Sequence, residues 1–306
     1  MFFFNLKKHW YNVNIFLSLY HIFYTKTFTN YIMKRILVPT DFSKHAEYAL
    51  RVAAQIAKEN SCEIVLLHML ELPHQAGDAL GSGHNIPEIM FFKNAAINNL
   101  ENLKYADYLE GVPVSEIVLF EKTFEGVLSV SKKNNIDFVV MGSHGASGYQ
   151  EMLIGSNTEK VVRLSEVPVL VIKNKTDEFK SSNFVFASDF SDEIKKPFKK
   201  VLEFASAFNS HLSLVMINTP NSFKSTIVAE KMMSDFIKNF NYPNCSFHIY
   251  NDVNVEKGII NFSNSIKADL IGMCTHGRTG LAHFFNGSIS EDLVNHSVKP
   301  IITFKI

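Results

Sequence analysis

An internal repeat is the feature of this 306-residue chain that most restricts how it can fold. Residues 36–43 read ILVPTDFS, and residues 184–191 read FVFASDFS. Each segment is an apolar run, typical of a strand buried on both faces, and each ends in Asp-Phe-Ser. A chain that carries the same strand and turn twice is expected to contain two copies of one structural unit.

A second motif also occurs twice. SHG at 143–145 precedes GS at 155–156, and THG at 275–277 precedes GS at 287–288. The two halves therefore share their beginnings and ends and differ in length between these motifs. The extra residues of the first half fall in 73–87, which are rich in Gly, His and Pro. We interpret this stretch as a flexible loop, with a lid over a ligand as the alternative.

Strand-like and helix-like patterns alternate along each half. Such alternation predicts parallel sheets with helices on both faces, so the fold class is α/β with two doubly wound five-stranded parallel sheets, one per half. We expect domains at 33–177 and 178–306, and pairing of the apolar edge strands 168–173 and 300–306. The other strands are expected at 34–39, 64–67, 114–119 and 137–141, and at 184–187, 212–217, 246–250 and 269–273.

Composition narrows the classes of function. The hydrophobic content of 46% is that of a chain with a buried core. The net charge of +0 gives no broad positive field, so nucleic acid is not an expected partner. The three cysteines show neither a disulfide framework nor zinc-ligand spacing, which favours a reducing, cytoplasmic location and no metal site.

The first 32 residues differ from the rest, because they are aromatic and carry lysines without acidic residues. Their apolar run at 13–23 is shorter than the ~20 residues that span a bilayer, so no membrane partner is expected. We interpret residues 1–32 as an extension that is disordered or results from a mis-assigned start, with Met33 as the first residue of the repeat. A signal segment or surface anchor is the alternative.

A glycine-containing loop is the sharpest local signal. Gly142 and Gly145 follow the strand expected at 137–141, and Gly155 and Ser156 precede a helix-like pattern. Glycines let backbone amides approach an anion closely, and a helix N-terminus presents N–H groups and a partial positive charge. We therefore expect a phosphate to bind here through N–H and hydroxyl donors.

The start of the helix predicts a capping box. Ser156 is followed three residues later by Glu159, and Ser288 and Glu291 repeat this spacing. No lysine follows Gly155, which distinguishes the loop from a P-loop and argues against rapid hydrolysis.

Taken together, these motifs resemble the universal stress protein family. The resemblance rests on VPTDFS at 38–43, LLH at 66–68, VMG at 140–142, the G-x2-G-x9-G-S loop and PVLVIK at 168–173, and it covers residues 33–306, once per half. It implies a strand order of 3-2-1-4-5, domains that pair through the fifth strand, and ATP or AMP as ligand, with or without Mg.

The resemblance also assigns roles to residues. Asp41 would meet the ribose or adenine side, with Pro39, Thr40 and Met69 lining the base pocket. The ribose and phosphates would fall to Met141, Gly142, Gly145, Gly155, Ser156, Asn157 and Thr158. In the second half the matching residues are Asp189, Gly277, Gly287, Ser288 and Ser290.

The second half departs from the family pattern. Cys274 occupies the position of Gly142, Ala187 that of Pro39, and we place Ile217 and Asn218 at the positions of His68 and Met69. A side chain where close approach is needed would cost strain or block part of the pocket, so we expect nucleotide mainly in the first half.

Two histidines and one cysteine are further candidates for a chemical role. His144 and His276 recur at one loop position, where a contact to backbone or phosphate is favoured over a metal site, because no other ligands accompany them. Cys274 is interpreted as a small turn residue, with a redox-active thiol as the alternative.

Three functions remain open from the sequence. The first is a nucleotide-binding regulatory or stress-response module, whose occupancy alters the packing of the two halves, or of a homodimer, and so the affinity for a protein partner that the sequence does not identify. The second is a ligand-free interaction or chaperone-like protein. The third is an enzyme, either a slow ATPase or an adenylyl-transferring relative of the same α/β superfamily, for which no catalytic residue is assigned.

Overall fold

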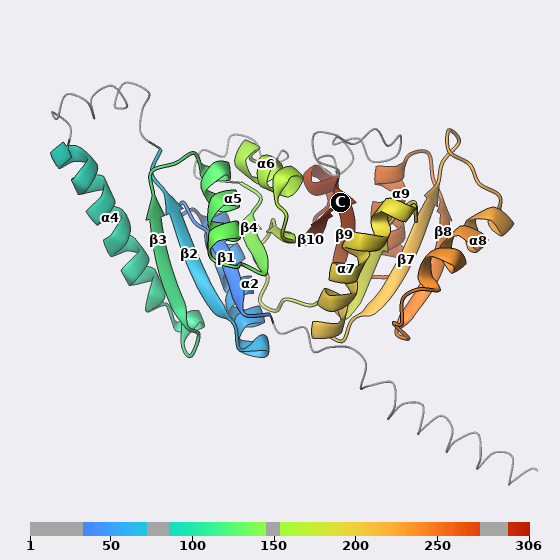
Figure 1. The fold of residues 1–306 in the computed structure, drawn as a ribbon, viewed down its shortest axis with the longest axis horizontal. Helices are drawn as coiled ribbons and strands as arrows, with labels where there is room; N and C mark the ends of the chain where they lie inside the picture. The colour runs from blue at the N-terminus through green and yellow to red at the C-terminus, as the bar shows by residue number, and fades with distance from the viewer. Residues whose placement is uncertain (1–32, 72–85, 145–153, 276–292) are drawn as a thin grey trace, which may run out of the picture. The chain divides into compact units, whose positions relative to one another are not determined.

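The computed structural model describes residues 33–71, 86–144, 154–275 and 293–306. Its strands form one ten-stranded sheet, shown in Figure 1, in the order β3-β2-β1-β4-β5-β10-β9-β6-β7-β8. Each half thus has the strand order 3-2-1-4-5 that the family resemblance implied. The strands are β1 Arg35–Pro39, β2 Glu63–Met69, β3 Val114–Leu119, β4 Phe138–Gly142, β5 Val169–Ile172, β6 Asn183–Ala187, β7 His211–Asn218, β8 Cys245–Asn251, β9 Leu270–Thr275 and β10 Ile301–Lys305.

The fifth strands of the two halves join the two predicted sheets into one. Val169 pairs with Thr303 and Val171 with Ile301 in antiparallel register, whereas the other neighbouring strands pair in parallel. The expected pairing of these edge strands is therefore confirmed. Its physical reason is that each strand covers the apolar edge of the other. The proposed domain boundary between residues 177 and 178 stays a prediction.

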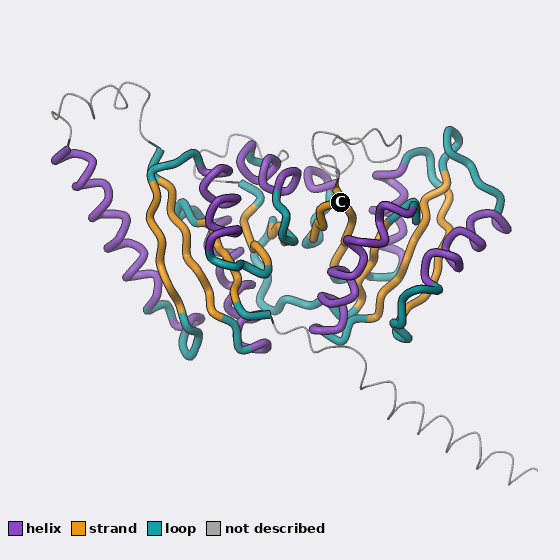
Figure 2. Tube along the Cα trace, in the orientation of Figure 1, coloured by secondary structure: helices purple, strands orange, loops and turns teal. Residues whose placement is uncertain are grey.

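Helices connect the strands, as Figure 2 shows in purple. None of those within the described residues has the length and apolar character that crossing a bilayer requires. The helices are α2 Lys44–Asn60, α4 Ile86–Lys104, α5 Thr123–Lys133, α6 Ser156–Leu164, α7 Lys195–Ala207, α8 Thr226–Ile237 and α9 Val255–Ser265, with short 3-10 turns η1 Asp107–Leu109 and η2 Asp192–Ile194.

The sequence pattern across residues 88–110 predicts a single helix, and α4 is shorter than that range. It ends at Lys104, where the N–H groups of Tyr105 and Ala106 bond to carbonyls three residues back and tighten the last turn. The chain then forms η1, which buries Leu109. Residues 1–32 and most of the predicted loop at 73–87 lie outside the described residues.

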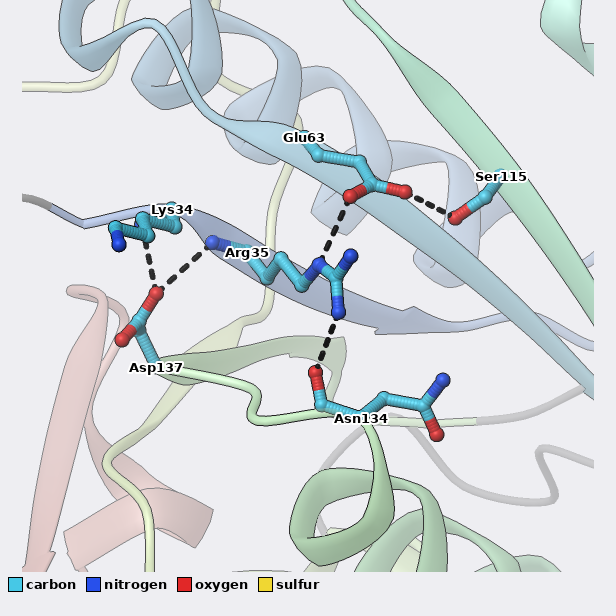
Figure 3. Close-up of polar contacts among 6 residues, drawn as sticks. All are labelled: Lys34, Arg35, Glu63, Ser115, Asn134 and Asp137. Carbon is cyan, nitrogen blue, oxygen red and sulfur yellow. Dashed lines mark hydrogen bonds and ion pairs between the residues drawn. The ribbon is translucent and has the colours of Figure 1, made fainter.

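Polar contacts fix the amino end of the first-half sheet, opposite the end where the glycine loop lies (Figure 3). One carboxylate oxygen of Asp137 accepts the N–H groups of Lys34 and Arg35, at 2.7 and 2.9 Å. The Arg35 side chain pairs with Glu63, which also accepts from Ser115. These partners belong to β1 to β4 and the turns before them, so the cluster holds neighbouring strands in register.

The core of the second half is built from phenylalanine rings. Phe198 of α7 is fully buried and lies edge-on to Phe236 and Phe240, with centroids 4.9 Å away in each case. Phe186 of β6 lies 5.4 Å from the same ring. Edge-to-face aromatic pairs add to the free energy of area burial, so Phe198 links α7, α8 and the sheet.

Lys173 lies where the two halves meet, one residue after β5. Its Nζ donates to the main-chain carbonyl of Asn295 in the second half. Lys305, at the end of β10, makes the matching bond to the carbonyl of Arg163, at 3.1 Å. Burial lowers the pKa of Lys173 to about 8 and also lowers that of Lys305.

We expect Phe198→Ala to lower the free energy of unfolding by about 3–5 kcal/mol, because the cavity it leaves is lined by rings that cannot collapse. Urea denaturation followed by circular dichroism measures the change. The matched control is Phe223→Ala, whose ring is 71% exposed and should change the value by less than about 0.5 kcal/mol. Equal effects of the two variants would contradict the assignment of this core.

A pH dependence follows from Lys173. Between about pH 8 and 10.5 the unfolded chain holds a proton on this amine that the folded chain has lost, so folding stability rises with pH across that interval. Lys173→Met removes this contribution. Denaturation series at several pH values should show the difference between wild type and variant growing toward pH 10.5, and parallel curves would contradict the lowered pKa.

Candidate functional site

A cavity of about 310 Å³ opens at the carboxyl ends of the first-half strands. It lies where β1 and β4 are neighbours, the point at which the strand order reverses and at which open parallel sheets bind ligands. The lining comes from the ends of β1, β2 and β4 and the starts of α2, α5 and α6. The lining residues are Pro39, Thr40, Asp41, Ala46, Leu67, Met69, Thr123, Met141, Gly142, His144, Gly155, Ser156, Asn157 and Thr158.

The cavity brings together the predicted first-half residues that the structure describes, while Gly145 lies outside the described residues. Ala46, Leu67 and Thr123 line it as well, and sequence reasoning missed them. Leu67 was detectable, because it lies two residues before Met69 and so on the same face of β2. Thr123 begins the helix after β3, so it also belongs to the carboxyl edge of the sheet.

The turn after β1 is held by its own side chains. Thr40 Oγ1 accepts the N–H of Phe42 at 3.1 Å, and Asp41 Oδ1 accepts that of Ser43 at 3.1 Å. Phe42 adopts a left-handed conformation with φ 62°. Ser43 then caps α2 by accepting from Ala46, as its position predicts. Asp41 therefore has a structural bond as well as a place on the cavity wall.

Gly142 is required for close approach. A Cβ added there would lie 2.7 Å from both the carbonyl carbon and the oxygen of His45, in the first turn of α2. Backbone atoms cannot yield to such a contact, so a residue other than glycine would displace the start of the helix. Close packing, and not a positive φ, explains this glycine.

The start of α6 corrects the predicted capping box. The N-cap is Gly155 and not Ser156, and no side chain caps the helix. Glu159 donates its N–H to the carbonyl of Gly155, which puts Ser156 inside the first turn. The Glu159 carboxylate pairs with Arg163 instead of reaching back. The repeat of the box at Ser288 and Glu291 lies outside the described residues.

Internal bonds reduce the donors available at this end of α6. The N–H of Gly155 donates to Ser143 O at 2.7 Å, and the buried Thr158 hydroxyl donates to Gly142 O at 3.0 Å. By helix geometry the N–H groups of Ser156, Asn157 and Thr158 have no intrahelical acceptor. These three groups and the exposed Ser156 hydroxyl form the donor set, which we call the cradle. No lysine or arginine lines the cavity within the described residues.

The equivalent place in the second half has a much smaller cavity among the described residues. Its pocket, which Asp189 lines with Ala187, Lys224 and Val255, measures about 20 Å³. The side-chain amide of Asn218 donates to the carbonyl of Lys224 and accepts the N–H of the same residue. These two bonds hold the chain after β7 near the strand ends. The predicted Gly277, Gly287, Ser288 and Ser290 lie outside the described residues.

Strand register corrects one predicted equivalence. Pro39 pairs with Leu67 in the first half, and Ala187 with Val215 in the second, so the counterpart of Met69 is Ile217 and not Asn218. Helix packing agrees, because a Cβ on Gly126 would meet Met69 and one on Gly258 would meet Ile217. Met216 therefore takes the position of His68.

Comparison with known proteins agrees with this architecture. The sequence model of the universal stress protein family matches residues 33–173 and 243–305. The chain belongs to the universal stress protein family. Universal stress protein MJ0577 of Methanocaldococcus jannaschii is 33% identical over 155 residues, which are 46% of this chain and 96% of that protein. Bacillus subtilis universal stress protein YxiE is 30% identical over 148 residues, 46% of this chain and all of that protein.

A solved structure supports the fold over a longer stretch. A universal stress protein from Archaeoglobus fulgidus matches with a TM-score of 0.70 at 22% identity. The match covers 91% of this chain and 99% of that one. At this identity the likeness shows the fold alone, and the two matches to the family model fit a tandem universal stress protein.

Cys274 departs from the family motif without gaining reactivity. It is buried, and burial raises the pKa of its thiol, with the nearby Asp189 adding to the shift. A redox-active cysteine needs a stabilised thiolate, so the redox alternative is not favoured. Cys274 lies inside β9 and is therefore not the turn residue that we expected. His144 Nδ1 lies 2.9 Å from Ser143 Oγ, and the described residues hold no cluster of three or more ligands for a metal ion.

The thiols supply a prediction. Burial raises the pKa of Cys62 to about 11 and raises the pKa values of Cys245 and Cys274, so little thiolate exists at pH 8. We expect the native chain to react slowly with a chromogenic disulfide reagent at pH 8. In denaturant, which serves as the control, three equivalents should react at once. Rapid labelling of native Cys274, located by peptide mapping, would contradict its burial.

Proposed function

We propose that this universal stress protein binds one adenine nucleotide, ATP or AMP, in its first half and acts as a regulatory module. The single observation that carries the proposal is the cavity of about 310 Å³ at the reversal point of the sheet, with the N-terminus of α6 on its wall. That volume lies within the range of small-molecule sites. One part of the wall is apolar and another part is polar, so a ligand with an apolar end and a charged end would bind in one orientation.

The apolar part of the wall suits a planar base. Pro39, Leu67, Met69 and Met141 contribute apolar side chains from three neighbouring strands. Met69 lies against Gly126 of α5, where a Cβ would approach its sulfur to 2.8 Å, so the helix holds the thioether in place. Asp41 follows on the same edge, where a carboxylate suits the hydroxyls of a ribose.

The polar part of the wall suits phosphate. The cradle offers the N–H groups of Ser156, Asn157 and Thr158 and the Ser156 hydroxyl, at the positive end of a nine-residue helix. Glycine at 155 leaves the approach to these amides open. Since the charge is met by main-chain dipoles, a bound magnesium ion would serve mainly to balance the remaining phosphate charge.

Binding without rapid turnover is part of the proposal. Asp41 is the one carboxylate on the described wall, and its Oδ1 already accepts the N–H of Ser43. Phosphoryl transfer usually relies on cationic side chains or metal ions around the transferred group, together with an oriented nucleophile. The described lining supplies dipoles and not such cations, which favours a sensor of nucleotide over an ATPase.

The second half has a different role in this proposal. Its pocket of about 20 Å³ is too small for a nucleotide, and Cys274 occupies the position where Gly142 meets the helix. We place the protein in the cytoplasm, because its three cysteines are free thiols. The partner that senses occupancy is a protein whose identity is left to experiment.

Titration calorimetry of the full chain with ATP, AMP and adenosine tests the proposal. We expect one nucleotide per chain and tighter binding of ATP than of adenosine. Gly155→Asp should abolish ATP binding, because Asp is a good N-cap whose carboxylate takes the N–H groups and repels phosphate. The variant should also fold well for the same reason.

Gly155→Asn is the matched control, since it caps the same N–H groups without charge. It should weaken ATP binding less than Gly155→Asp, and neither variant should change adenosine binding. Phosphate release is followed in parallel. Absence of heat with all three ligands at millimolar concentration would refute the proposal, and fast hydrolysis sensitive to Gly155→Asp would replace it with an ATPase.

A further inference from the structure

One residue of the second half bonds to both segments that frame the cradle of the first half. Asn295 lies in the short helical segment 293–296, after two fully buried residues, Leu293 and Val294. Its side-chain Oδ1 accepts the N–H of Ile154 at 2.6 Å, and its main-chain carbonyl accepts from Lys173 Nζ. Ile154 directly precedes Gly155, and Lys173 directly follows β5.

These bonds close a circuit around the base of α6. Ser143 donates its N–H to Ile172 O at 3.0 Å, and the N–H of Gly155 donates to Ser143 O at 2.7 Å. Hydrogen bonds join Asn295 to Ile154, Gly155 to Ser143, Ser143 to Ile172, and Lys173 to Asn295. Peptide links from Ile154 to Gly155 and from Ile172 to Lys173 complete the ring. Every step is a hydrogen bond or a peptide link, so the first amides of α6 are held on both sides.

Among the described residues, the acceptor of the Ile154 N–H is Asn295 Oδ1. Ile154 is half-buried and packs against the hydrophobic core, so its N–H loses a hydrogen-bond partner if the Asn295 amide is removed. The position of Ile154 fixes the position of Gly155, the N-cap of α6. The orientation of Gly155 in turn fixes the direction in which the N–H groups of Ser156, Asn157 and Thr158 point.

The first half does not make the same side-chain contact to the second half, although the strand order of the two halves is the same. The register of β5 with β4 and of β10 with β9 makes Asn295 the counterpart of Arg163, and Lys305 that of Lys173. Both lysines make the cross-half bond to a carbonyl. A guanidinium has no acceptor atom, so the Arg163 side chain cannot accept a main-chain N–H as Asn295 does.

We infer that Asn295 is a positioning residue through which the second half orients the phosphate cradle of the first half. The inference rests on the proposed function, and it gives the second half a role that does not need a nucleotide of its own. It also specifies how occupancy and the junction of the halves are linked, since a shift of the segment 293–296 would move Ile154. Phosphate contacts should depend on Asn295, and contacts to the base should not.

Two measurements on the full chain test this inference. The first is amide hydrogen exchange of Ile154 by NMR without ligand. Asn295→Ala should speed exchange at Ile154 about tenfold or more, and Asn295→Asp, which keeps an acceptor oxygen, should keep it slow. Equal exchange in wild type and Asn295→Ala would overturn the inference, because the contact would then be absent in solution.

The second measurement is binding of ATP and adenosine by calorimetry. Asn295→Ala should weaken ATP binding about tenfold and leave adenosine binding unchanged, because only the cradle is disturbed. The matched control is Lys305→Met, which breaks the other cross-half bond and should leave ATP binding unchanged. Equal loss of ATP and adenosine binding in Asn295→Ala, or no loss of either, would overturn the positioning role.

The failure of this inference is distinguishable from that of the proposed function. A wild-type chain that binds neither ATP nor AMP would refute the nucleotide site, and the positioning role would fall with it. A wild-type chain that binds ATP with the same affinity as Asn295→Ala would refute the positioning role alone.

Discussion

The antiparallel pairing of β5 with β10 is the constraint on which the other features depend. Each fifth strand is buried and apolar, and each would otherwise form an open edge of a five-stranded parallel sheet. Joining them in one chain places the end of α6 beside the end of the opposite sheet, where Lys305 and Thr275 reach carbonyls of Arg163 and Val162. The C-terminal end of α6, which lies away from the cradle, is therefore packed against the second half.

The two halves share one strand order but differ in the cavity at their strand ends, and a few side chains account for the difference. Glycine at 142 lets the main chain of α2 approach the end of β4. In the second half Cys274 stands at the matching position, and the segment after β6 forms the 3-10 turn η2 before α7 begins at Lys195. Lys224, which bonds to Asn218, lines a pocket of about 20 Å³ at the place where the first half has its larger cavity.

Much of this architecture could be predicted from the sequence, because the signals are local. Buried parallel strands read as continuous apolar runs, and Ser43 marks the start of α2 by its own hydroxyl. The prediction failed where the outcome depends on backbone position. The N-cap of α6 falls on Gly155 because its carbonyl accepts the first helical bond, and a one-residue register error arose at Ile217 because residue types alone did not align β7 with β2. The contact between Asn295 and Ile154 joins residues far apart in sequence, and no local pattern indicates it.

The Asp-Phe-Ser turn shows why a shared motif does not imply a shared site. In the second half Ser188 accepts from Phe190 at 2.9 Å and Asp189 from Ser191 at 3.1 Å, which reproduces the bonds of the first half. Phe190 has φ 58°, and its ring is buried against Phe236, so the strained conformation is repaid by packing. The turn is thus needed to connect strand to helix in both halves, whether or not a ligand binds. The hydrogen bond to Ser191 thus gives Asp189 a structural role of its own. In the nucleotide site that we propose for the first half, binding depends instead on the close approach at Gly142, the open volume beside Met69 and the amides next to the Asn295 contact.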